Sequence, residues 1–137
     1  MRIRYTPADD SPTSLMPWLS LTLQLNQHAV QVVGLLDTGS AVSILPYQVG
    51  LELGAAWDEQ TIQVPLAGSL GHIEARALVV FAFHPEINPD DPVRLVFAWI
   101  QTNNVPLILG QMNFFMEFDV CFYRSQDTFD VRLRGNE

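Results

Sequence analysis

The residues best suited to chemistry in this chain are Asp37, Thr38 and Gly39, which stand between two apolar runs. A carboxylate between core-forming segments is costly to bury unless hydrogen bonds or a chemical role compensate. The hydroxyls of Thr38 and Ser40 lie close by in the chain, and Gly39 allows another backbone to approach. An ordinary β-turn is the alternative, because Asp, Gly and Ser are turn-forming residues. The apolar flanks favour a functional carboxylate, since ordinary turns have polar neighbours.

Composition is typical of one globular domain. The 137 residues are 48% hydrophobic and 16% charged, which suits a buried core and disfavours disorder. The net charge of −8 disfavours nucleic acid and anionic membranes as partners. The apolar runs are too short to span a bilayer, and the N-terminal residues lack a signal-peptide core. We therefore expect a soluble, cytoplasmic protein.

Hydrophobic periodicity predicts an all-β domain. Residues 1–17 are rich in Pro, Asp, Ser and Thr, and we expect a flexible N-terminal arm there, ahead of a single domain over residues 18–137. Strands are predicted at 18–25, 29–36, 61–64, 73–83, 93–100, 117–123 and 128–133. This pattern predicts a closed, barrel-like sheet with one short helix near the C-terminal third, at 111–116, and a further helix candidate within 43–53.

A glycine-containing hairpin is expected at residues 64–73, with Gly68 and Gly71 at its tip. Such a tip is little packed, so the segment is either an ordinary surface hairpin or a movable lid.

Other candidate sites are weak. The histidines His28, His72 and His84 do not fall at metal-ligand spacings, and Cys121 is the single cysteine. We expect no metal and no cofactor, and we interpret Cys121 as a buried small hydrophobic residue.

Three features follow one another along the chain. They are Leu-Leu-Asp-Thr-Gly-Ser at 35–40, the expected hairpin at 64–73, and Leu-Ile-Leu-Gly at 107–110 before the expected short helix. Together they resemble the retropepsin-like aspartic proteases, in the single-domain form of retroviruses and some bacteria. The resemblance covers about residues 18–134 and implies a closed acid-protease barrel that cleaves a polypeptide substrate.

The resemblance implies roles for the matching residues. Asp37 would be catalytic, Thr38 would brace the site by bonding its counterpart in a second copy, and Gly39 would keep the substrate backbone close. The segment 67–71 would cover the cleft, and Ile108 would underlie the Asp37 loop. Substrate contacts are implied for Ser40, Ala41, Ala67, Gly68, Ser69, Leu70, Gly71 and Ile108.

Peptide hydrolysis of this type needs two carboxyl groups that share one proton at a separation of about 3 Å. This chain has one Asp-Thr-Gly-Ser motif, so the hypothesis requires a symmetric homodimer. A Ser40 hydroxyl donating to the carboxylate would stabilise its ionised form, which predicts an acidic working range of about pH 4–6.

Two positions depart from the retroviral pattern. Ser40 stands where those proteases usually have Ala, and Gln111 stands where they commonly have Arg after the second glycine. The alternative is therefore a non-catalytic retropepsin-like binding or scaffolding module, either monomeric or paired through another face. A small-ligand β-barrel is a third possibility. The intact Asp-Thr-Gly-Ser motif favours the enzyme.

Overall fold

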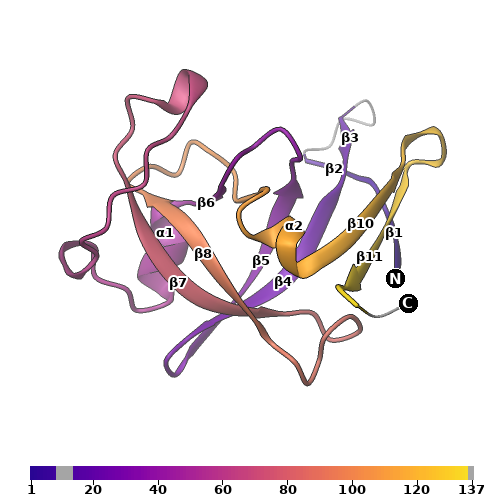
Figure 1. Ribbon diagram of the computed structural model, residues 1–137, viewed down its shortest axis with the longest axis horizontal. Helices are drawn as coiled ribbons and strands as arrows, with labels where there is room; N and C mark the ends of the chain where they lie inside the picture. Colours follow the sequence, from indigo (N-terminus) through magenta and orange to yellow (C-terminus); the bar gives the residue numbers. More distant parts are fainter. Residues whose placement is uncertain (9–13, 136–137) are drawn as a thin grey trace.

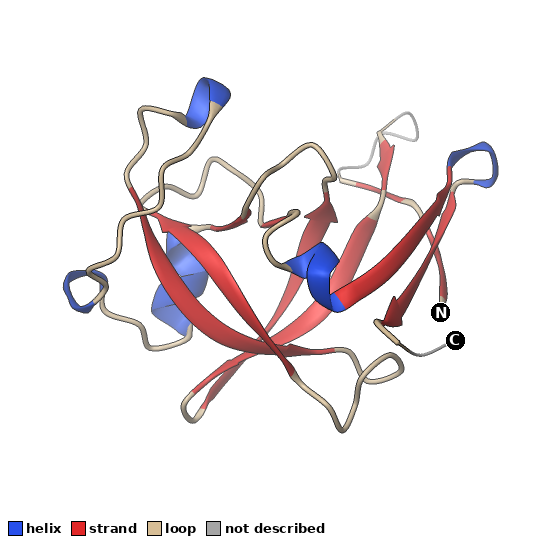
Figure 2. Cartoon of the chain, viewed as in Figure 1, coloured by secondary structure: helices blue, strands red, loops and turns tan. Residues whose placement is uncertain are grey.

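The computed structural model describes residues 1–8 and 14–135, and its centre is a closed six-stranded barrel (Figures 1 and 2). The strands follow one another around the barrel in the order β4-β5-β9-β6-β8-β7. Their bounds are β4 Trp18–Leu25, β5 His28–Leu36, β6 Ser43–Leu45, β7 Ala75–Phe83, β8 Val93–Ile100 and β9 Ile108–Leu109. The predicted all-β, closed-barrel fold class is confirmed.

The barrel encloses a core made by alternating strand positions. On β4, Leu19, Leu21 and Leu23 are at most 3% exposed, while the residues between them face outward or are partly covered. Strand β8 is buried on both faces over its last four residues, because Phe97 and Trp99 pack in the main core while Ala98 and Ile100 pack in a second apolar cluster. Because side chains alternate between the two faces of a strand, every second residue faces the core.

Two short helices flank the sheet, α1 (Tyr47–Glu52) and α2 (Phe114–Glu117). The helix expected within 43–53 is shorter than predicted, because residues 43–45 form β6, which pairs in parallel with β8. Pro46 separates that strand from α1, and Gly54 follows the helix with a φ of +80°. Three 3₁₀ turns complete the helical segments: η1 (Trp57–Glu59), η2 (Gly68–Leu70) and η3 (Arg124–Gln126).

A second sheet joins the two ends of the described chain. Strand β11 (Thr128–Leu133) lies between β1 (Arg2–Arg4) and β10 (Phe118–Tyr123), and all its pairings are antiparallel. The predicted N-terminal arm therefore contributes a paired strand, followed by the short pair β2 (Thr6–Pro7) and β3 (Leu15–Met16). Residues 9–13 of that arm lie outside the described residues.

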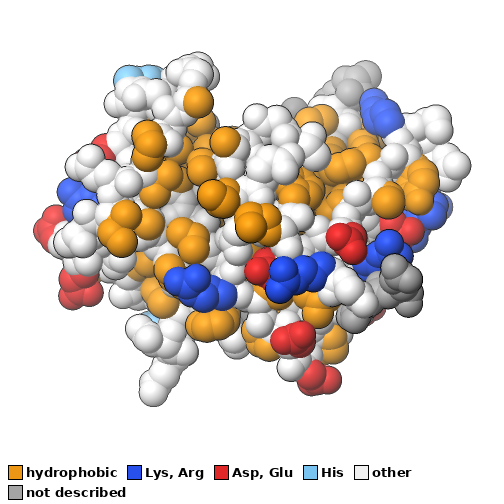
Figure 3. Space-filling view, in the orientation of Figure 1, with side chains coloured by type: hydrophobic (Ala, Val, Ile, Leu, Met, Phe, Trp, Pro, Cys, Tyr) orange, Lys and Arg blue, Asp and Glu red, His pale blue; other side chains and the backbone are white. Residues whose placement is uncertain are grey.

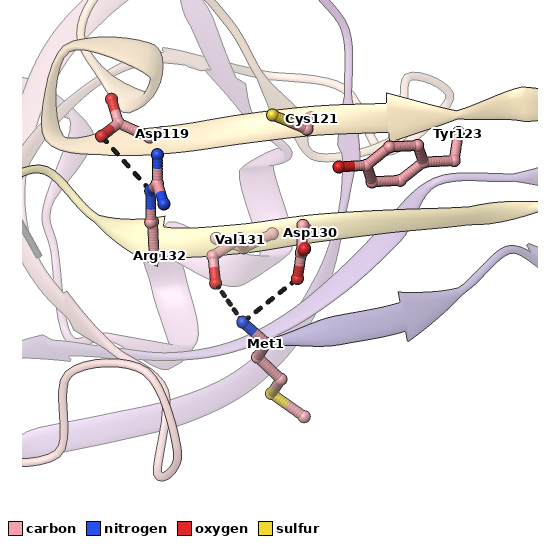
Figure 4. Close-up of a pocket in the computed structure, with 7 residues that line it drawn as sticks. All are labelled: Met1, Asp119, Cys121, Tyr123, Asp130, Val131 and Arg132. Atoms are coloured by element: carbon pink, nitrogen blue, oxygen red, sulfur yellow. Dashed lines mark hydrogen bonds and ion pairs between the residues drawn. The ribbon is translucent and has the colours of Figure 1, made fainter. Parts of the chain in front are cut away.

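Hydrogen bonds fix which way each strand of this terminal sheet faces. The Met1 amino group donates to the Val131 carbonyl at 2.8 Å (Figure 4). The Val131 amide donates back to the Met1 carbonyl at 3.0 Å. Odd-numbered residues of β11 therefore bond to β1, and the even-numbered residues bond to β10. Their β10 partners are Asp119, Cys121 and Tyr123. The N–H and C=O groups of Val120 and Phe122 consequently point to the outer edge of the sheet.

Two sequence predictions are corrected by this geometry. Cys121 is exposed, not buried, because it lies on the solvent face of the β10–β11 hairpin beside Tyr123 (Figure 4). Residues 61–64 form no strand; Gln63 makes one isolated bridge to Arg76, and Val64 donates to the Ala75 carbonyl at 2.9 Å. The Ala77 N–H donates to the Ile62 carbonyl at 2.8 Å on the other side of the bridge. Residues 61–63 are exposed, so no burial supports a longer strand there.

Within residues 1–8 and 14–135, no helix is both long and apolar enough to cross a membrane.

The loop after β7 is tied by one buried amide side chain. Asn88 is 2% exposed; its Oδ1 accepts the His84 N–H at 2.8 Å, and its Nδ2 donates to the carbonyls of Ala82 and Asp91. Burial lowers the pKa of the neighbouring His84, with the Glu86 charge acting in the opposite direction. The neutral ring suits the structure, because His84 Nδ1 accepts the Glu86 N–H.

We predict that Asn88→Ala lowers the free energy of unfolding by about 1–3 kcal/mol, because three backbone groups lose their partner. Urea denaturation measures the change. The control is Asn104→Ala, whose side chain is exposed and makes no hydrogen bond with the described residues. Equal midpoints for the two variants would contradict the assigned role of Asn88.

Candidate active site

Asp37 stands at the point where β5 leaves the barrel. Its backbone N–H donates to the Leu109 carbonyl of β9 at 3.0 Å, so the residue continues the parallel pairing of the two strands. Its side chain is partly exposed, and its Oδ1 accepts the Gly39 N–H at 2.9 Å. The carboxylate thus has one fixed donor among the described residues and is partly open to solvent. None of the ion pairs among the described residues includes Asp37.

The loop that carries Asp37 is interlocked with the segment that follows β9. Three backbone bonds join them: Gln111 N–H to the Ser40 carbonyl at 2.9 Å, Met112 N–H to the Ala41 carbonyl at 3.0 Å, and Ser43 N–H to the Met112 carbonyl at 3.0 Å. The buried Ser43 hydroxyl adds a fourth contact by accepting the Gly110 N–H at 3.0 Å. Two segments about seventy residues apart in the sequence are therefore held as one unit.

Gly110 permits this close approach. A Cβ atom at that position would stand 2.3 Å from the Val42 carbonyl oxygen and 2.8 Å from the Ser40 carbonyl oxygen. Both obstacles are backbone atoms of the Asp37 loop, so they cannot rotate away. Any side chain at residue 110 would push the loop off the segment that supports it.

The predicted hydrogen bond from the Ser40 hydroxyl to the Asp37 carboxylate is wrong, while the predicted contact of Ser40 with substrate stays a prediction. Its Oγ donates to the Val42 carbonyl at 2.7 Å, and a hydroxyl has one proton to give. The donor to the Asp37 carboxylate is instead the backbone N–H of Gly39. The serine shapes the turn, because its bond closes the loop two residues onward.

Gln111 contacts the loop through its side chain as well. Its Nε2 donates to the Thr38 carbonyl at 2.8 Å. Thr38 itself is exposed, and its side chain makes no hydrogen bond with the described residues. Both residues line a groove whose other wall is α2 and β10, with lining residues Phe115, Phe118, Asp119, Val120, Cys121 and Phe122.

The two-stranded hairpin predicted at 64–73 is wrong, because neither side of this segment forms a strand. Residues 64–73 form a hairpin-shaped loop beside the barrel, with the turn η2 at its tip (Figure 1). Its apolar side chains, among them Leu70, pack with Ile108 in a small apolar cluster apart from the main core. Hydrophobic groups gather on the same face between this hairpin and the middle of the molecule (Figure 3). Partly buried members of the cluster are Val42, Val64, Leu66, Leu70, Ile73, Val105 and Ile108.

The remaining predicted site residues differ in their surroundings. Ala67, Ser69 and Gly71 are exposed at the tip of the hairpin, and Gly68, with a φ of +65°, faces open space. Ala41 is exposed on the Asp37 loop. The structure therefore brings Leu70 and Ile108 into one cluster, and the predicted roles of all these residues stay predictions.

Within the described ranges, no three histidine, cysteine or acidic side chains gather in a way that could hold a metal ion.

Comparison with solved structures supports the fold assignment. The chain is similar to a retropepsin-like aspartic protease from Rickettsia conorii, with a TM-score of 0.66 and 11% identity over 96% of this chain and 91% of that one. It is also similar to EIAV protease complexed with the inhibitor HBY-793, with a TM-score of 0.51 and 15% identity over 75% of this chain and 88% of that one. No family profile and no curated protein matches the sequence. The resemblance read from the sequence is thus confirmed as a retropepsin-like fold.

Sequence reasoning missed the interlocking residues. The sequence does hold a signal for Ser43, because it is a hydroxyl residue within an apolar run. The structure shows that its side chain is fully buried. Gln111 was noted only as a departure from the retroviral pattern, and its bond to Thr38 could not be foreseen without the fold.

We predict that Gly110→Ala displaces the Asp37 loop and lowers the free energy of unfolding by about 2 kcal/mol or more, because the new Cβ meets backbone oxygens. Thermal unfolding and the amide spectrum of residues 37–42 measure the effect. Gly71→Ala is the control, since its φ of −62° suits alanine and the nearest atom to a new Cβ, the Gly68 carbonyl oxygen, is 3.3 Å away. An unshifted loop in Gly110→Ala would refute the account.

Proposed function

We propose that this chain is an aspartic endopeptidase whose active site forms when two copies bring their Asp37 side chains together. The observation that carries the proposal is the half-site: a partly exposed carboxylate, fixed by the Gly39 N–H, on a loop that is bonded to the segment after β9. The fold shared with two proteases supports it.

The chemistry follows from two carboxyl groups in contact. Like charges about 3 Å apart cannot both ionise, so the pair holds one proton between them. The ionised carboxylate takes a proton from water, which attacks the peptide carbonyl carbon, while the protonated carboxyl donates a hydrogen bond to the carbonyl oxygen. The proton then passes to the leaving nitrogen as the C–N bond breaks. No cofactor is required for these steps.

The outer edge of β10 is the face that we assign to the second copy. Among the described residues, no strand pairs with the outward N–H and C=O groups of Val120 and Phe122, and such an edge can accept another strand. The groove beside this edge is also lined by Thr38. A strand added to β10 would therefore lie against the residue next to Asp37, which a pairing through the far side of the barrel would not achieve.

Symmetry restricts the register of that pairing. Only residues with outward-facing groups can exchange hydrogen bonds, and on β10 these are Val120 and Phe122. In an antiparallel pair related by a two-fold axis, the two residue numbers of every pair have the same sum. When both numbers are even, half of that sum is a whole number, so the axis lies at one residue, which is Val120, Cys121 or Phe122. The exposed side chains of Asp119, Cys121 and Tyr123 would then face one another across the axis.

A non-catalytic binding module is the second candidate. One observation favours it: the Gln111 side chain bonds to its own chain, whereas an arginine at this position would suit an ionic brace to a partner. Such a module would keep the barrel and the Asp37 loop without uniting two carboxylates. It predicts no cleavage that depends on Asp37.

We predict cleavage of an unstructured protein mixture with a maximum at about pH 4–6, because the dyad needs one proton and loses it as the pH rises. Asp37→Asn should abolish the cleavage. Asp58→Asn, which removes an exposed carboxylate outside this groove, should leave the activity unchanged. A rate maximum above neutrality, or cleavage that survives in Asp37→Asn, would contradict the proposal. No cleavage at any pH or concentration would favour the module.

We predict that Val120→Pro weakens dimerisation by about 10-fold or more, because each copy loses an outward N–H from the edge while the bonds to β11 remain. Sedimentation equilibrium measures the dissociation constant, and specific activity should fall on dilution at higher protein concentrations than in wild type. Val120→Ala, which keeps the N–H, is the matched control. Equal dissociation constants for the two variants would place the interface elsewhere.

A further inference from the structure

The side chain of Gln111 completes a chain of hydrogen bonds that ends on the Asp37 carboxylate. Gln111 Nε2 donates to the Thr38 carbonyl oxygen at 2.8 Å. The same peptide group carries the Gly39 N–H, which donates to Asp37 Oδ1 at 2.9 Å. The Thr38–Gly39 peptide group therefore accepts one hydrogen bond at its oxygen and donates another from its N–H. The nitrogen of the amide must face Thr38, because the carbonyl it meets can only accept.

This peptide plane is the part of the loop most able to turn over. Glycine imposes little restriction on its own backbone angles, and both Thr38 and Gly39 are exposed. If the plane rotated by half a turn, the Gly39 N–H would leave the carboxylate and the Thr38 carbonyl oxygen would approach it. A donor fixed on the Thr38 oxygen opposes that rotation. It also polarises the peptide group, which strengthens the bond that the N–H makes.

Gln111 is well placed to act as this donor. Its own backbone N–H bonds to the Ser40 carbonyl at 2.9 Å, so the side chain starts from a fixed point on the far side of the loop. The preceding Gly110 is packed against Val42 and Ser40, which holds that starting point in place. The side chain is exposed, so its replacement leaves the core intact.

We propose that Gln111 is a positioning residue, which holds the Thr38–Gly39 peptide in the orientation that keeps its N–H on Asp37. This inference rests on the proposed protease function for its catalytic consequence, but the positioning itself is a property of the single chain. The proposal also gives Gln111 a function within its own loop, at the position where retroviral proteases commonly have arginine.

The catalytic test compares three variants at protein concentrations well above the dimer dissociation constant, so that assembly does not limit the rate. Gln111→Met has a similar length without a donor, and we expect kcat to fall about 3- to 10-fold with KM changed less than about 2-fold. Gln111→Glu places an acceptor against the Thr38 oxygen and should lower kcat further. Gln111→Arg restores a donor and should recover most of the loss.

The positioning is tested without catalysis by hydrogen exchange of the Gly39 amide, followed by NMR on the uniformly ¹⁵N-labelled chain. We expect exchange to be about 5- to 10-fold faster in Gln111→Met, with wild-type protection in β8 and near-wild-type exchange in Gln111→Arg. Unchanged Gly39 exchange in Gln111→Met, or an Arg variant as fast as the Met variant, would overturn the inference. If the wild type cleaves nothing, the protease proposal fails, and this exchange measurement still decides the positioning role.

Discussion

The structure depends on the close contact between the Asp37 loop and the segment after β9. A Cβ on Gly110 would stand 2.3 Å from the Val42 carbonyl oxygen, so the two backbones meet where only glycine fits. The amide of Asp37 and the amides of residues 111 and 112 bond across this contact. The barrel strands β5 and β9 bring the segments together, and the interlock then fixes the carboxylate. Without it, an exposed loop between strands would hold no defined geometry.

Much of the fold could be predicted from local patterns. The alternating leucines of β4 and the apolar run of β8 gave the correct strands, because each strand's burial follows directly from its residue types. Residues 43–45 were misassigned, because a short buried strand and a helix turn share an apolar pattern, and its parallel pairing with β8 is not local. Cys121 was predicted to be buried, but the β10–β11 hairpin has a solvent face that the neighbouring aromatic residues conceal in the sequence.

The candidate site was predicted in its residues but not in its bonds. Asp37 and Gly110 were found because an acidic residue or a glycine among apolar residues is conspicuous. The partners of Ser40 and Gln111 depend on angles and distances of a fraction of an ångström, which no spacing rule provides. The Ser40 hydroxyl accordingly bonds to Val42, and the Gly39 amide takes the place predicted for it.

The central claim is that each chain supplies half of a catalytic pair. Activity at a fixed total protein concentration, measured against the fraction of Asp37→Asn chains after subunits have exchanged, tests it directly. If both carboxylates are required, activity follows the square of the wild-type fraction, and an equal mixture retains about one quarter of it. A linear decline, with about one half retained in the equal mixture, would show that each chain works alone and would contradict the account.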